Sequence, residues 1–204
     1  MRSIRLDTQP IATDLASLGT VSASVSLNLT GIPAGAGLTT TVSQNVSSDA
    51  QNAFQLAAGG NGLALGDVAY TLNIVKANLT NDRDIAGATI RMAVSPAWVD
   101  AHGGADAIRI IRFAEDGTRE VLATRLVDTD ASGNLVFEAA SPNGLSVFGL
   151  AAVSAMPQTS SGSSSSGTST AVGAASNLKA GESATLPMRT TAVSAITVTT
   201  NHAV

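Results

Sequence analysis

Residues 21–30 read Val-Ser-Ala-Ser-Val-Ser-Leu-Asn-Leu-Thr, and this stretch decides the fold class. Apolar and polar side chains alternate along it without interruption. A period of two places the two sets on opposite faces of a β-strand, so the segment predicts a strand with one buried and one solvated face. The glycines and the proline of residues 31–37 end it.

Strand-like segments of the same kind recur along the chain, separated by turn residues. We predict further strands over residues 38–46, 68–79, 89–94, 107–113, 119–127, 135–139 and 145–153. In the 68–79 strand, Val68, Tyr70, Leu72 and Ile74 are expected on the inner face. Short strands with frequent turns are typical of an all-β antiparallel sandwich, which is the predicted fold class.

One short helical turn is expected near residues 96–102. Ser95 can accept the first helical N–H groups, Pro96 fits the first helical position, and Gly103 suits the left-handed end. Trp98 is the only tryptophan of the chain, and we expect it to plug one end of the sandwich.

The composition divides the chain into four parts. Residues 1–20 are expected to form an N-terminal arm, and residues 21–153 the β-sandwich. Residues 154–177 are rich in Ser, Gly and Thr and read as a linker. Residues 178–204 return to β character, and such a short segment must dock on its own sandwich or on a neighbouring subunit.

Charged residues make up 13% of the chain, about half the usual share. With a net charge of −4 and no basic cluster, the chain is not expected to bind nucleic acid. No stretch of apolar residues is long enough to cross a membrane. The first residues lack the apolar core of a secretory signal, so export would need a longer precursor or another route.

The sequence offers little for catalysis, and we predict neither an enzyme nor a cofactor. The two histidines, His102 and His202, lie near no nucleophile-bearing motif and are expected to be solvated. Cysteine is absent, which excludes thiolate metal sites and a cysteine nucleophile.

A weak calcium candidate comprises Asp128, Asp130 and Ser132, followed by Gly133. Alternating oxygen ligands with glycine at the sixth position resemble the start of a calcium loop. The closing carboxylate is missing, because Ala139 stands at the twelfth position. The favoured interpretation is an ordinary turn between two strands.

Three Asn-x-Ser/Thr sequons could carry glycans. They begin at Asn28, Asn45 and Asn78. In a chain so rich in Ser and Thr, that number arises by chance, so the sequons permit glycosylation without arguing for it.

An ordered run of motifs between residues 65 and 153 resembles the PGF-pre-PGF domain of archaeal cell-surface proteins. The segments that carry the resemblance are Ser-Pro-Ala-Trp at 95–98, Gly103, Ile-Arg-Ile-Ile-Arg-Phe at 108–113, Leu-Ala-Thr at 122–124 and the Glu-Ala to Val-Phe stretch at 138–148. The resemblance implies a non-enzymatic role in a surface layer (S-layer) or in a sheath of the kind that encloses filamentous methanogens.

These observations predict an extracellular structural subunit that assembles with copies of itself through strand edges. Two uncharged strands are the candidate assembly elements, because no charge repels an incoming strand. Their apolar residues are Val21, Val25 and Leu27 in the first strand and Val193, Ile196 and Val198 near the C-terminus. The alternative is a cell-surface adhesion or glycan-binding module, which would need an exposed aromatic platform.

Overall fold

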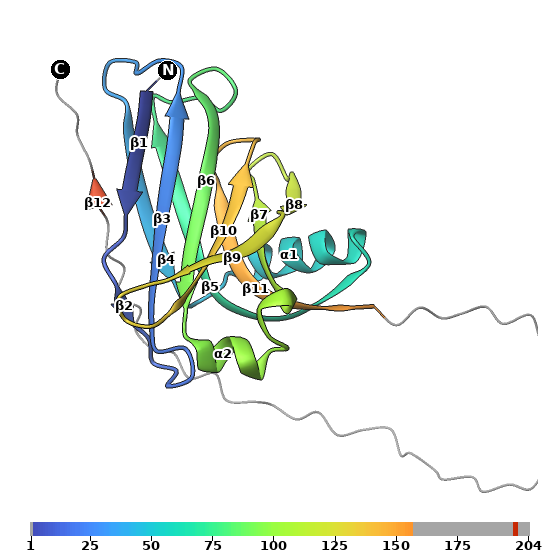
Figure 1. The fold of residues 1–204 in the computed structure, drawn as a ribbon. Coiled ribbons are helices and arrows are strands. Elements are labelled where there is room, and N and C mark those ends of the chain that lie inside the picture. The colour runs from blue at the N-terminus through green and yellow to red at the C-terminus, as the bar shows by residue number, and fades with distance from the viewer. Residues whose placement is uncertain (1, 157–197, 200–204) are drawn as a thin grey trace, which may run out of the picture. The chain divides into compact units, whose positions relative to one another are not determined.

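The computed structural model describes residues 2–156 and 198–199. The chain forms two antiparallel sheets that face each other across one hydrophobic core, which confirms the predicted β-sandwich (Figure 1). The strands are β1 (Arg2–Asp7), β2 (Ile11–Ala12), β3 (Thr20–Leu29), β4 (Gly37–Ser43), β5 (Leu63–Ala77), β6 (Ile85–Val94), β7 (Ile108–Phe113), β8 (Arg119–Val121), β9 (Thr124–Thr129), β10 (Leu135–Ser141), β11 (Val147–Ala155) and β12 (Val198–Thr199).

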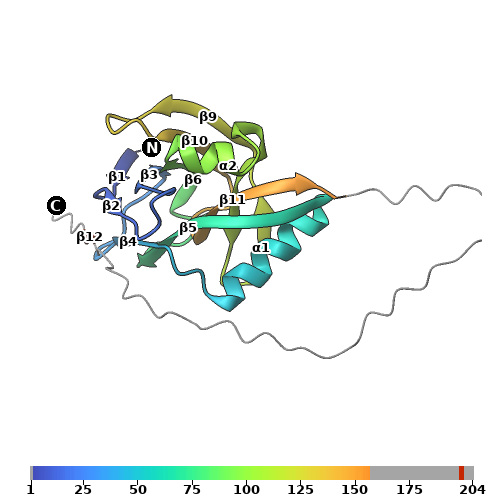
Figure 2. The same cartoon turned by 90° about the horizontal axis from the view of Figure 1, so that it is seen from below.

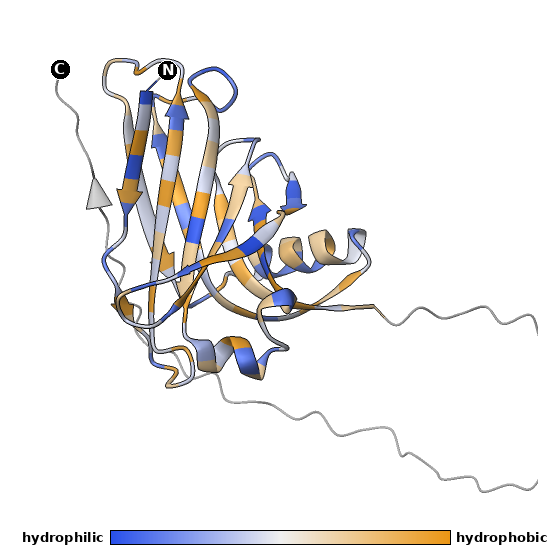
Figure 3. Ribbon diagram, in the orientation of Figure 1, coloured by the Kyte–Doolittle hydropathy of each residue, from blue (hydrophilic) through white to orange (hydrophobic). Residues whose placement is uncertain are grey.

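The first sheet has the order β1-β3-β6-β10-β9, with β2 also paired to β3, and the second sheet has the order β12-β4-β5-β11-β7-β8. Hydrophobic and hydrophilic residues alternate along the strands, as Figure 3 shows. The alternation arises because a strand such as β3 buries one face in the core and leaves the other less covered. In β3, the residues with odd numbers from Val21 to Leu29 are buried.

The short helix α2 (Pro96–Ala101) closes one end of the sandwich (Figure 1). The Ser95 hydroxyl caps it by accepting a hydrogen bond from the Trp98 amide at 3.2 Å. Trp98 is 4% exposed and belongs to the core between the sheets, as expected for a plug. A 3-10 turn, η1 (Ala105–Ala107), leads from this helix into β7.

A second helix, α1 (Ser48–Gly60), was not expected from the sequence. It lies on the outer face of the second sheet, on the side away from the first sheet (Figure 2). Ala50, Phe54 and Ala57 pack there against Ile111 and Ala151 in a second hydrophobic cluster. The spacing of these apolar residues by four and three positions was one sequence signal for a helix. Ser47, which can cap the first turn, was another.

A β-bulge in β5 changes which side chains face the core. The register with β11 shifts between Leu150 and Ala151, and both Ala69 and Tyr70 belong to the inner core. Val68 therefore packs in the outer cluster beneath α1, so its expected inner position was wrong. A bulge adds one residue to a strand and reverses the alternation beyond it, which the hydrophobic pattern alone does not reveal.

The N-terminal residues contribute to the sandwich. β1 pairs with β3 over six residues, from Arg2 opposite Leu29 to Asp7 opposite Ser24, and β2 pairs with the start of β3. The arm predicted for residues 1–20 is therefore largely an edge of the first sheet.

Candidate functional site: the sheet edges

The predicted assembly strand at residues 21–30 is not an edge, and this expectation was wrong. β3 pairs with β1 on one side and with β6 on the other. Val21, Val25 and Leu27 are fully buried in the core between the sheets. The absence of charge in this segment reflects its central position, because both of its backbone edges are already hydrogen bonded.

Apart from the two-residue β12, the outermost strands in the described part of the chain are β1, β9 and β8, and each of them carries features that discourage pairing with another chain. β1 has exposed charges, including an Arg5–Asp7 ion pair at 2.9 Å. β9 contains Arg125 and Asp128 and has a shifted register against β10. β8 is three residues long and includes Arg119 and Glu120.

β4, which has only the two-residue β12 on its outer side, lacks these features. Its sequence is Gly-Leu-Thr-Thr-Thr-Val-Ser, without charge or proline. It pairs with β5 in an unbroken register from Gly37 to Ser43. Leu38, Thr40 and Val42 point into the sandwich, whereas the residues between them are half-buried on the outer face. This strand is therefore a regular template for another strand.

A C-terminal strand already lies on part of this edge. β12 pairs antiparallel with β4, with Val198 opposite Thr40 and Thr199 opposite Thr39. Among the described residues, the pairing covers two positions of the seven-residue strand. Val193 and Ile196, the other two predicted assembly residues of this segment, lie outside the described residues.

An apolar hollow, which we call the seam groove, lies between β1 and β4 where the two sheets end side by side. It has a volume of about 520 Å³. Its apolar lining comprises Ile4 and Leu6 of β1, Leu29, Ile32, Leu38 of β4 and Leu79, and Arg2 and Arg5 also border it. Leu38 is almost completely buried, while Ile4, Leu6 and Ile32 are only partly covered.

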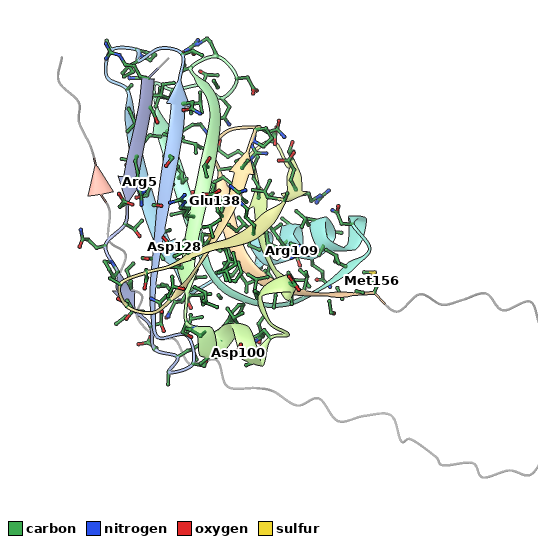
Figure 4. All side chains as sticks on the ribbon, viewed as in Figure 1. Arg5, Asp100, Arg109, Asp128, Glu138 and Met156 are labelled. Carbon is green, nitrogen blue, oxygen red and sulfur yellow. The ribbon has the colours of Figure 1, made fainter. Side chains whose placement is uncertain are left out.

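The outer face of the first sheet carries an ion-pair cluster centred on Glu138. Arg91 and Arg125 each donate to one carboxylate oxygen, over 2.7 and 2.5 Å. These hydrogen bonds, first that from Arg125 and then that from Arg91, lower the pKa of Glu138. Figure 4 shows Glu138 among the strands of this sheet, with Arg5 and Asp128 on the same side. Arg91, Glu138 and Arg125 lie opposite one another on adjacent strands, so the cluster fixes the pairing of β6, β10 and β9.

A buried guanidinium holds the turn before β11. Arg112 is 3% exposed, pairs with Glu120 at 3.3 Å and donates to the Asn143 carbonyl at 2.8 Å. Asn81 accepts a hydrogen bond from the Leu145 amide at 3.1 Å. A hollow of about 520 Å³ adjoins these residues.

The weak calcium candidate is an ordinary turn in the structure. One Asp130 carboxylate oxygen accepts hydrogen bonds from the Ser132 and Asn134 amides, and the other accepts from the Asn134 side chain. Asp128 accepts from the Thr129 amide. Within residues 2–156, no three acidic or histidine side chains gather closely enough to hold a metal ion.

His102 is held in place rather than solvated. Its Nδ1 lies 2.7 Å from the Trp98 carbonyl oxygen, and its Nε2 lies 2.9 Å from an Asp67 carboxylate oxygen. The ring stacks on the Trp98 indole with centroids 4.2 Å apart. Both nitrogens are thus engaged within the protein. His202 lies outside the described residues.

The three sequon asparagines, Asn28, Asn45 and Asn78, are all exposed. Asn78 has a φ of 52° and its side-chain amide donates to the Gly35 carbonyl at 3.1 Å. A glycan on Asn78 would replace one of the two hydrogens of the side-chain amide that donates to Gly35. Glycans on Asn28 and Asn45 would not affect this loop contact.

Neither α1 nor α2 has the length and hydrophobicity that a membrane-crossing helix requires. Comparisons of the chain with models of protein families, with characterised proteins and with solved structures found no match. The resemblance to the PGF-pre-PGF domain therefore stays a prediction that rests on the quoted motifs.

Proposed function

We propose that this chain is a non-enzymatic structural subunit of an extracellular protein coat, of the S-layer or sheath type, and that it polymerises with copies of itself. The observation that carries the proposal is the strand β4, which is regular, uncharged and seven residues long and pairs with β12 over only two described positions of its outer side. A monomeric protein normally blocks such an edge, because its unpaired backbone groups recruit other strands.

The contrast among the edges supports the proposal. β1, β8 and β9 have charges, short length or a register shift, so the chain uses protective features where it needs them. Among the described strands at the sheet margins, only β4 lacks these protective features. Selective protection of this kind directs association to one strand and limits disordered aggregation.

The low charge of the whole chain is a second support. With 13% charged residues, the surface carries much Ser and Thr and little charge to keep copies apart. In a coat, where subunits remain packed against each other, such a surface is an advantage. Localisation outside the cell is part of the same proposal.

The competing proposal, an adhesion or glycan-binding module, has less support. A sugar-binding platform needs an exposed aromatic ring. Trp98 and Tyr70 are both buried, and the Tyr70 hydroxyl lies within hydrogen-bonding distance of the Ser22 and Ala93 backbone carbonyls inside the sandwich.

Electron microscopy of the purified protein tests the coat proposal directly. We expect ordered filaments or sheets from the natural sequence. Thr41→Lys places a charge on the outer face of β4 and is expected to abolish polymers while the monomer stays folded. Asn28→Lys, on the exposed face of the central strand β3, is the matched control and should polymerise normally. A natural chain that remains monomeric at high concentration would contradict the proposal.

A further inference from the structure

We infer that the seam groove, together with the β4 edge, receives an extended strand from a second copy of this chain, and that this strand is the C-terminal segment around β12. The inference deepens the coat proposal and rests on it for the identity of the partner. It assigns a binding surface and a particular segment to the association.

The edge chemistry defines what the surface can bind. The amides and carbonyls on the outer side of β4, where β12 pairs with Thr39 and Thr40, bind an extended peptide by backbone hydrogen bonds, while adjacent apolar side chains select its side chains. The seam groove supplies that apolar surface beside β4, through Leu38 and Ile32. A helix or a polar ligand would leave the backbone groups of β4 unpaired.

The direction of the strands favours one occupant. β1 and β4 run in the same direction, and β12 runs opposite to both (Figure 1). A strand that enters the seam with the polarity of β12 is antiparallel to each flanking strand, which is the pairing found throughout both sheets. β12 lies on Thr39 and Thr40, directly beside Leu38 of the groove lining.

The sequence of the C-terminal segment fits an edge strand. Residues 191–200 contain no charge and no proline, and Val193, Ile196 and Val198 supply apolar side chains among threonines. Strand addition needs a segment of this type, because charge and proline oppose pairing.

The distance along the chain allows exchange between copies. The sandwich strands end at Ala155 and β12 begins at Val198, so a long Ser- and Gly-rich stretch joins them. A tether between a strand and its own sandwich gives that strand an effective concentration on the order of millimolar. Subunits packed in a coat present the same edge at comparable or higher concentration. On a neighbouring subunit, the segment therefore makes the same contacts that it makes on its own sandwich.

Cysteine cross-linking tests the inference, since the natural chain has no cysteine. Thr39 and Thr199 are direct partners in the register, a geometry within reach of a disulfide. Full-length Thr39→Cys and Thr199→Cys chains are mixed under assembly conditions and oxidised. We expect a disulfide-linked heterodimer, identified by mass spectrometry. Asn28→Cys mixed with Thr199→Cys is the control and should give only background cross-linking.

Obstruction of the groove provides a second measurement. Ile32→Arg places a guanidinium in the groove, and we expect about tenfold less cross-linked heterodimer because the incoming strand would have to bury that charge. Leu56→Arg, at an exposed position of α1, is the control and should not change the yield. Circular dichroism of each variant establishes that the monomer is folded.

The outcomes separate this inference from the coat proposal. Cross-links found only within a single chain carrying both cysteines would overturn the inference, since the strand would then close on its own sandwich. Polymers without the cross-link would overturn it too and leave the coat proposal standing. Cross-linked dimers that never extend to polymers would support the seam as a strand acceptor and contradict the coat.

Discussion

The His102 side chain shows how one residue can make this fold sensitive to pH. Its two nitrogens face two acceptors, the Trp98 carbonyl and the Asp67 carboxylate, and only the imidazolium can donate to both. Burial lowers the pKa of His102, but the hydrogen bonds to Trp98 and Asp67 outweigh it and the net pKa is raised. The stacked indole also favours the charged ring.

A raised pKa in the folded state means that the stabilisation is complete below the unfolded pKa of about 6.5 and is lost as the pH rises through the folded value. We therefore expect the melting temperature to fall as the pH rises above about 6.5. The Trp98 fluorescence should report the same titration, because Trp98 is the only tryptophan. His102→Asn should remove this pH dependence, whereas His202→Asn should retain it. A flat profile in the natural chain would contradict this role of His102.

Gly149 illustrates a position where a single methyl group matters. A Cβ atom built at Gly149 would lie 2.5 Å from the Phe54 ring of α1. Gly149→Ala is expected to destabilise the fold by about 1–3 kcal/mol, the usual cost of overpacking. Chemical denaturation measures the change.

Two further variants make the Gly149 prediction specific. Phe54→Leu should reduce the cost of Gly149→Ala, since the two residues share one site and their effects couple. Gly87→Ala should be nearly neutral, because nothing lies within 4 Å of its Cβ position. Equal costs in both Phe54 backgrounds would show that the helix is free to move away from the sheet.

At the scale of single elements, α1 depends on its cap and on its contact with the second sheet. The Ser47 hydroxyl accepts a hydrogen bond from the Ala50 amide at 3.2 Å. We expect Ser47→Ala to cost about 1 kcal/mol of stability, a common value for the loss of an N-cap. Ser48→Ala, one residue later and exposed, is the control and should change stability little. Equal effects of the two substitutions would refute the capping role.

At the scale of the whole molecule, β1 protects the central strand β3 from other chains. β1 pairs with six residues of β3 and carries the charges of this edge. Deletion of residues 1–8 should uncover the uncharged β3 and give soluble aggregates, measured by light scattering. Asn28→Lys in the truncated chain should restore monomers, because it charges the new edge. A truncated chain that stays monomeric without this substitution would contradict the protective role of β1.

Much of the architecture was determined by the sequence, because alternation and turn chemistry are local. The strict period of two at residues 21–30, the Ser95–Pro96 start of α2 and the burial of Trp98 follow from side chains close together in the chain. The helix α1 was also present as a spacing of Ala50, Phe54 and Ala57, although its alanines give a weak signal.

Tertiary structure alone decided which strands are edges. An uncharged strand looks the same in sequence whether it lies in the middle of a sheet, as β3 does, or at its margin, as β4 does. Strand order depends on pairings between residues far apart in the chain, and a bulge such as that at Tyr70 changes the facing of a strand without a mark in its pattern. The groove between β1 and β4 exists because those pairings bring the two sheet margins together.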